Sequence, residues 1–134
     1  MENSTFTDEV VHIVIPVAPV TKKNSSRVLY KYINGKKVPF IAPSVAYKQY
    51  ERDCGFFLKP LGIDYPVNIK TVFYMGTRRH VDLTNLLEAI HDTMVHCGTI
   101  TDDNYKIVKS VDGSRVEYDK TNPRTEIWIT KYAE

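Results

Sequence analysis

Apolar residues recur along this 134-residue chain with two periods, and each period predicts a different kind of element. Runs rich in β-branched residues and bounded by Gly, Pro or Asn are typical of strands. Runs of this kind predict strands at Val10–Val17, Val67–Met75, Ile107–Val111 and Thr125–Thr130, with a short strand at Val116–Tyr118 between the last two.

Local signals predict a hairpin and a helix between the first two long strands. Asn34-Gly35 indicates a tight turn joining Val28–Ile33 to Lys37–Ile41, because both turn residues tolerate positive φ. Ser44 is placed to cap a helix that runs to about Leu58.

A second helix is predicted at Leu83–Cys97. Asp82 occupies its N-cap position, with Asn85 three residues on, and Gly98 ends it. Its apolar residues fall on one stripe at helical spacing, which we expect to face the core. The stripe consists of Leu83, Leu86, Leu87, Ile90 and Met94.

These elements predict an α+β fold, a mixed β-sheet with two helices, in a single domain over residues 1–134 with residues 1–9 frayed. Hydrophobic residues make up 43% of the chain and charged residues 25%, as in soluble globular proteins. Cys54 and Cys97 are too few for a disulfide framework, and nothing resembles a signal peptide or a membrane span. We expect a reduced, cytoplasmic protein with no membrane partner.

Charge is distributed unevenly in a way that the net charge of +2 conceals. Residues 10–50 contain no acid, and their basic residues form either a binding surface for a polyanion or an ordinary solvated face. Acids without basic neighbours repel one another, so a fold that gathers them calls for a cation. Residues 81–105 hold five acids and no Lys or Arg: Asp82, Glu88, Asp92, Asp102 and Asp103.

Helical spacing places Asn85, Glu88 and Asp92 on one face, away from the leucine stripe. If the strand that follows the last acids pairs with the long central strand, Asp103 returns to the neighbourhood of Asp82. Oxygen ligands in this arrangement suit Mg²⁺, with Mn²⁺ as an alternative, and such an ion supports phosphodiester hydrolysis. The competing interpretations are a simple cap, a solvated helix face and a turn.

Basic residues next to these acids are candidates for phosphate contact, which would make binding salt-dependent. A Ser/Asn-rich loop leaves backbone N–H groups free for phosphates, and a basic knot directly precedes the acids. Ordinary solubilising charge is the alternative. The candidates for phosphate contact are Lys22, Lys23, Asn24 and Arg27 in the loop, and Arg78, Arg79 and His80 in the knot.

Aromatic and histidine side chains add weaker indications. Tyr30, Tyr32 and Phe40 in the hairpin suit either stacking on unpaired bases or packing across a dimer interface, and packing is favoured. Trp128 is expected in the core. The histidines of the acidic region, His80, His91 and His96, are expected to be solvated or to support the site rather than to bind Mg²⁺, which prefers oxygen.

The chain resembles the RusA family of Holliday junction resolvases, which includes many prophage-encoded members, over nearly its whole length. The resemblance lies in Asp82-Leu83-Thr84-Asn85-Leu86-Leu87, followed by Asp92 and then Asp102-Asp103-Asn104. The first strand ending Ile15-Pro16, the loop Lys22-Lys23-Asn24-Ser25-Ser26 and the strand ending Arg78-Arg79-His80 follow in the expected order.

This resemblance implies a homodimeric, Mg²⁺-dependent endodeoxyribonuclease that resolves four-way DNA junctions in recombination and repair by symmetric nicking. By position it implies that Asp82 and Asp103 are catalytic. Two positions depart from the family, which has a second acid where this chain has Thr84 and a Lys where it has Glu88. Either Glu88, with Asp92, replaces the lost ligand, or the protein is a module that binds branched DNA with weak or lost catalysis.

Overall fold

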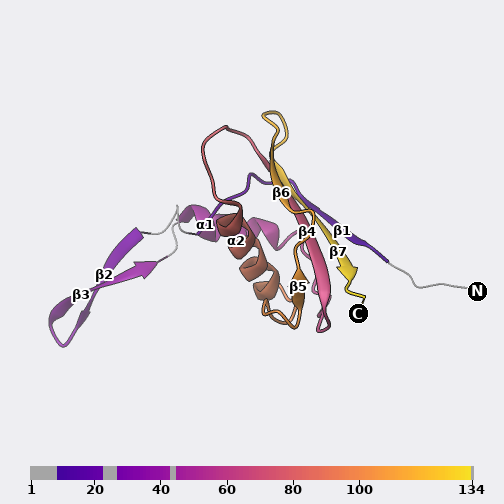
Figure 1. Cartoon of the computed structure of the whole chain (residues 1–134). Helices are drawn as coiled ribbons and strands as arrows, with labels where there is room; N and C mark the ends of the chain where they lie inside the picture. Colours follow the sequence, from indigo (N-terminus) through magenta and orange to yellow (C-terminus); the bar gives the residue numbers. More distant parts are fainter. Residues whose placement is uncertain (1–8, 23–26, 43–44, 134) are drawn as a thin grey trace, which may run out of the picture.

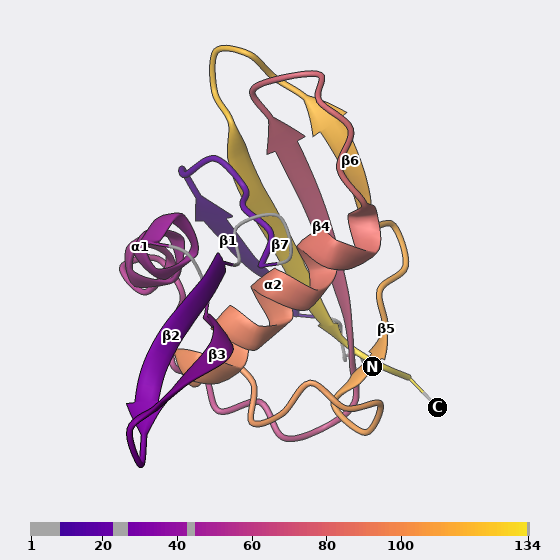
Figure 2. The same cartoon turned by 90° about the vertical axis from the view of Figure 1, so that its left-hand side faces the viewer.

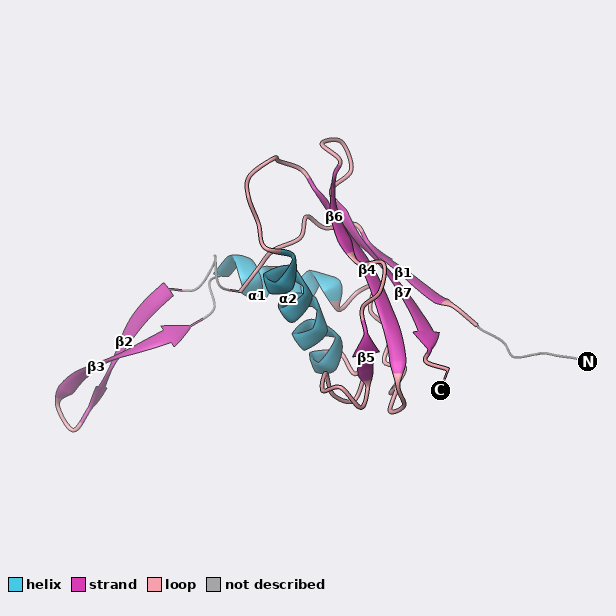
Figure 3. Cartoon of the chain, in the orientation of Figure 1, coloured by secondary structure: helices cyan, strands magenta, loops and turns pink. Residues whose placement is uncertain are grey.

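The computed structural model of this chain describes residues 9–22, 27–42 and 45–133, and of Arg27 only the backbone. It contains two helices, a five-stranded mixed sheet and a two-stranded hairpin, which confirms the predicted α+β fold (Figure 3). The elements are β1 (Val11–Ile15), β2 (Arg27–Ile33), β3 (Lys36–Ala42), α1 (Val45–Cys54), β4 (Val67–Met75), α2 (Leu83–His96), β5 (Val108–Ser110), β6 (Arg115–Tyr118) and β7 (Arg124–Lys131).

β4 is the central strand of the five-stranded sheet. β7 pairs antiparallel along one of its edges, and β1 pairs antiparallel with β7. β5 and β6 run parallel to β4 along the other edge, one after the other, so the predicted pairing of residues 107–111 with the central strand is confirmed. Asn68 of β4 binds the turn that separates β5 from β6. Its Oδ1 accepts hydrogen bonds from Ser110 Oγ at 2.6 Å and from the Asp112 N–H at 2.8 Å.

Both helices lie on one face of this sheet, and α2 crosses β4 and β7 (Figures 1 and 2). The predicted stripe of α2 faces the sheet, with Leu86, Ile90 and Met94 fully buried. α1 closes the layer from the side, where the Tyr47 hydroxyl lies 3.3 Å from Thr93 Oγ1 of α2. Among the described residues neither helix combines the length and apolarity needed to cross a bilayer.

The opposite face of the sheet holds Trp128, contrary to the prediction that it lies in the core. Side chains alternate along a strand, and in β7 the inward positions belong to Ile127 and Ile129. Trp128 is half-buried on the outer face, stacked on His12 with ring centroids 4.7 Å apart. Lys70 Nζ lies 4.8 Å from the Trp128 ring centroid, so the indole is held between two neighbours rather than packed under the helices.

The hairpin and α1 begin as predicted, and α1 ends earlier. Asn34 has φ 52° and Gly35 has φ 78°, the two positive values that a tight hairpin turn requires. After Cys54 the Phe56 and Phe57 N–H groups donate to carbonyls three residues back, at 3.2 and 2.9 Å, so the regular helix ends at Cys54 instead of Leu58. The predicted cap, Ser44, lies outside the described residues.

We expect stability to depend on pH through His91, because it is buried and its Nε2 has no hydrogen-bond partner among the described residues. Burial lowers the pKa of His91 to about 4. Below its ordinary pKa of 6.5 the unfolded chain takes up a proton that the folded chain refuses. The free energy of unfolding is therefore expected to fall by about 3 kcal/mol from this residue between pH 6.5 and pH 4.

The measurement is urea denaturation across this pH range for the wild type, His91→Gln and His96→Gln. His96 is the matched control, since it lies on the same helix but is exposed. Only the His91 variant should lose this part of the pH dependence. Equal pH profiles for all three proteins would mean that His91 takes up its proton in the folded state.

Candidate functional site

The C-terminal half of α2 and the loop after it bring Asp92 and Asp103 together. Asp92 lies on the solvent side of α2 and Asp103 in the loop before β5. The pKa of Asp103 is raised, first by partial burial and then by a hydrogen bond and charge repulsion from Asp92. We call these two residues the acid pair. Two carboxylates this close favour either one shared proton or one bound cation.

Lys22 contacts the acid pair from the loop after β1, 70 residues away in the chain. Its Nζ donates to Asp92 Oδ2 at 2.5 Å, and this hydrogen bond raises the pKa of Lys22. The Lys22 ammonium also lies 5.5 Å from the centroid of the Tyr47 ring. Residues 81–105 contain no Lys or Arg, but the fold brings Lys22 to Asp92, so part of their charge is already compensated.

Asp82 lies at the other end of α2. It occupies the N-cap position, yet its carboxylate makes no capping bond to the backbone and instead accepts a hydrogen bond from Asn85 Nδ2 at 3.3 Å. Ten residues separate Asp82 from Asp92, which is about 15 Å along a helix. The structure therefore places Asp103 beside Asp92 rather than beside Asp82. The catalytic role of Asp82 stays a prediction.

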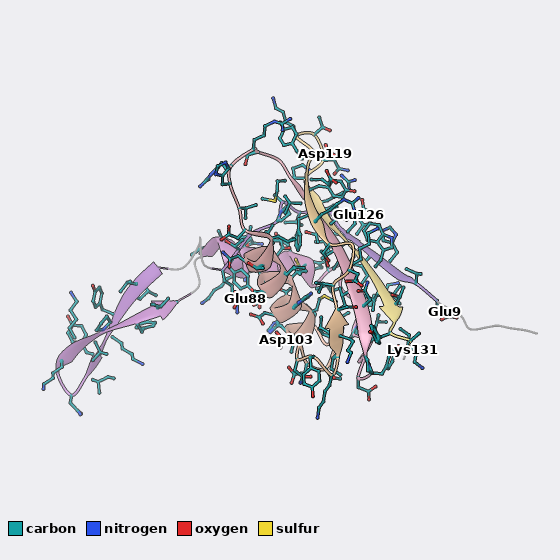
Figure 4. The ribbon with its side chains drawn as sticks, viewed as in Figure 1. Glu9, Glu88, Asp103, Asp119, Glu126 and Lys131 are labelled. Carbon is teal, nitrogen blue, oxygen red and sulfur yellow. The ribbon has the colours of Figure 1, made fainter. Side chains whose placement is uncertain are left out.

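The two remaining acids of residues 81–105 are Asp102 and Glu88. Asp102 Oδ1 accepts a hydrogen bond from the Asp103 N–H at 2.7 Å, so Asp102 shapes the turn that presents Asp103. Glu88 is exposed one turn before Asp92 on the same face of α2. Figure 4 shows Glu88 and Asp103 on the helical side of the sheet, away from Asp119 and Glu126.

The basic knot lies in the loop between β4 and α2. The Arg78 guanidinium sits over the Tyr118 ring, 3.9 Å from its centroid. Arg79 and His80 line a cavity of about 330 Å³ together with apolar residues, among them Val20, Met75, Val81 and Leu86. Thr21 lines the same cavity and is followed by Lys22, so one loop connects the knot to the acid pair.

The predicted contacts of the loop after β1 can be placed only in part. Lys23 and Asn24 lie outside the described residues, and the side chain of Arg27 is not described. The contact of the Tyr47 ring with Lys22 was not predicted from the sequence, because the spacing of Tyr47 in α1 marks it only as a buried helix position. No sequence signal joins it to α2.

The chemistry of the acid pair fits Mg²⁺ or Mn²⁺. Mg²⁺ prefers oxygen ligands, keeps several of its waters and uses only one or two protein carboxylates. The pKa of Asp103 is raised first by burial and then by Asp92, and a cation would offset the repulsion between the two carboxylates. Within the described ranges, however, no group of three or more His, Cys, Asp or Glu side chains is gathered closely enough to hold a metal ion. Any metal site here uses the pair, with Glu88 as the nearest further acid along α2.

Comparison with known proteins adds no relative. No family model matches the chain, and a search of curated proteins finds no match either. The interpretation of the site therefore depends on its residues and their geometry.

Proposed function

We propose that the protein is a Mg²⁺-dependent endodeoxyribonuclease of RusA type that cuts four-way DNA junctions. The observation that carries the proposal is the acid pair, Asp92 beside Asp103, with the Lys22 ammonium 2.5 Å from Asp92. Phosphodiester hydrolysis needs a site that binds a cation and positive charge nearby, and the acid pair and Lys22 are the candidates for these two parts. Two copies related by a two-fold axis would match the symmetry of a junction.

In this proposal each side chain has a separate task. Asp92 and Asp103 would hold Mg²⁺, which when bound would supply positive charge for the phosphoryl oxygens and make a water more acidic. The Asp103 carboxylate would also accept the proton of the attacking water. Lys22 orients Asp92 and offsets negative charge, and Arg79 binds a phosphate farther along the strand near the start of α2.

A second candidate is a module that binds branched DNA with weak or lost catalysis. The Lys22 ammonium favours it, because it occupies one side of Asp92, where a cation would bind. Thr84 favours it too, since a hydroxyl replaces the carboxylate expected from the family resemblance. The two candidates differ in one measurement on a synthetic four-way junction. The enzyme binds without divalent metal and cuts when Mg²⁺ is added, whereas the module binds under both conditions and leaves the DNA intact.

Glu88→Gln tests whether Glu88 compensates for Thr84. If Glu88 supports the acid pair, the variant is expected to cut roughly tenfold more slowly and to need more Mg²⁺ for half-maximal cutting, because a supporting carboxylate is lost. The measurement is the rate of junction cleavage against Mg²⁺ concentration. Glu117→Gln is the matched control, an exposed glutamate on β6 that pairs with Arg115.

Thr84→Asp is the converse variant, since it restores the acid expected from the resemblance. Faster cutting by Thr84→Asp, with no effect of Glu88→Gln, would show that Glu88 does not compensate. Equal cutting by wild type and Glu88→Gln is sufficient to reject the compensation.

A further inference from the structure

The β2–β3 hairpin exposes a large apolar surface for a two-stranded element. Val28, Tyr30, Tyr32 and Ile41 are 55%, 56%, 74% and 75% exposed and lie on one face of the hairpin. Among the described strands, β2 and β3 pair only with each other, and the hairpin projects from the helical side of the molecule (Figure 1). A lone hairpin is marginally stable in water, and soluble proteins rarely leave such patches uncovered. This surface is therefore of the kind that a partner covers.

The charge of the hairpin selects the class of partner. Residues 27–42 carry four basic residues, Arg27, Lys31, Lys36 and Lys37, and no acid. Two hairpins from two copies of the chain would repel each other if they packed together. A polyanion is complementary instead, and its phosphates would release counterions as the lysines bind.

Aromatic rings and ammonium groups alternate along the hairpin. Lys37 Nζ lies 4.4 Å from the centroid of the Tyr30 ring, and Lys31 Nζ lies 5.5 Å from that of Phe40. Sequence-tolerant sites for single strands combine rings that stack on bases with cations that contact the backbone. The hairpin carries both the rings and the cations, and a ribbon of two strands is narrow enough to enter a DNA groove.

The tip concentrates these features. In the register of the two strands Tyr32 lies opposite Lys37, and Ile33 lies opposite Lys36. Tyr32 and Ile33 are 74% and 48% exposed. Because side chains alternate along a strand, Tyr32 and Lys37 share one face of the tip, and Ile33 and Lys36 share the other. Each face of the tip thus carries one exposed apolar and one basic residue. Side chains of this kind act as wedges between bases where stacking is already weak.

We infer that the β2–β3 hairpin is a DNA-binding arm whose tip contacts the branch point of a junction. Tyr32 and Ile33 lie against unpaired or unstacked bases, and Lys36 and Lys37 bind the flanking phosphates. The inference rests on the proposed function for its ligand, branched DNA, and adds the element that recognises the branch.

Tyr32→Ala tests the contact with bases. Junction affinity is expected to fall roughly tenfold, because one stacked base is lost, while affinity for a linear duplex changes less than about twofold. Binding is measured by fluorescence anisotropy without divalent metal, together with the fluorescence of 2-aminopurine placed at the branch point. Tyr32→Phe keeps the ring and should behave as the wild type. Phe56→Ala removes another exposed ring, outside the hairpin, and should leave both readouts unchanged.

Lys36→Gln combined with Lys37→Gln tests the contact with phosphates. The slope of log affinity against log salt should become shallower by about 1.8, because each lost phosphate contact contributes about 0.9. Both side chains are exposed, so their replacement removes no core contact.

Two outcomes would overturn the inference. If the substitutions weaken self-association in sedimentation but leave junction affinity unchanged, the hairpin is an interface between copies of the chain. If Tyr32→Ala weakens duplex and junction binding equally, the tip does not contact the branch point. Because binding is measured without metal, these results are separate from the proposed function. A protein that binds DNA through the hairpin but does not cut it contradicts only the proposed nuclease. A protein that cuts, and whose tip variants bind junctions as tightly as the wild type, contradicts only the inferred arm.

Discussion

Asp103→Asn is expected to lower Mg²⁺-dependent cutting of a four-way junction by at least about a hundredfold while junction binding without metal is retained. The amide keeps the shape of the side chain but loses the charge that holds the cation and the site that accepts a proton. Loss of an outer-shell partner of a metal ligand already costs 10- to 100-fold, so loss of a ligand should cost at least as much. The measurement is single-turnover cleavage with enzyme in excess over junction.

Companion variants separate the acids of α2. Asp92→Asn should match Asp103→Asn, because the two carboxylates form one pair. Asp82→Asn should have a smaller effect, because Asp82 lies about three turns away along α2. Asp112→Asn is the control, an exposed aspartate in the turn between β5 and β6. Full activity in Asp103→Asn would exclude the acid pair as the site of cutting.

Phe73→Ala is expected to destabilise the fold by about 3–5 kcal/mol, the usual cost of removing a buried aromatic ring. Phe73 is 1% exposed, near the end of β4 that leads to the loop with Arg78, Arg79 and His80. Domains of this kind are stable by only about 5–15 kcal/mol, so the variant loses a large part of its stability. Thermal denaturation should show a midpoint roughly 12–20 °C lower.

Val14→Ala is the matched control, since Val14 is 41% exposed on the outer face of β1. It should shift the free energy of unfolding by less than about 1 kcal/mol. A loss below about 1 kcal/mol in Phe73→Ala would mean that its ring is not packed between the sheet and the helices.

Elements with strong local signals were predicted well. The bounds predicted for β4 match the structure, since a long apolar run with turn residues on both sides has few alternatives. Asn34 and Gly35 adopt the positive φ values that the hairpin turn requires. The stripe of α2 was predicted because its spacing matches the helical period, and its central residues are buried.

Predictions that depended on partners far away in the chain were less secure. Trp128 is apolar and lies in an apolar strand, but the alternation of β7 places it on the face opposite the helices. The contacts of the acids were also not predictable from local spacing. Asp103 was expected near Asp82 and lies beside Asp92. The basic residue that pairs with Asp92 is Lys22, 70 residues away in the chain.

The sequence by itself determined which segments become helix, strand and turn, and which residue types line the exposed face of α2. These properties follow from local backbone preferences and from the spacing of apolar residues, which act within a few turns or strand residues. Only the tertiary structure decided which acids meet, which cation compensates them and which face of the sheet the helices cover. These contacts depend on how the loop after β1 and the loop after α2 return to α2, which no local spacing specifies.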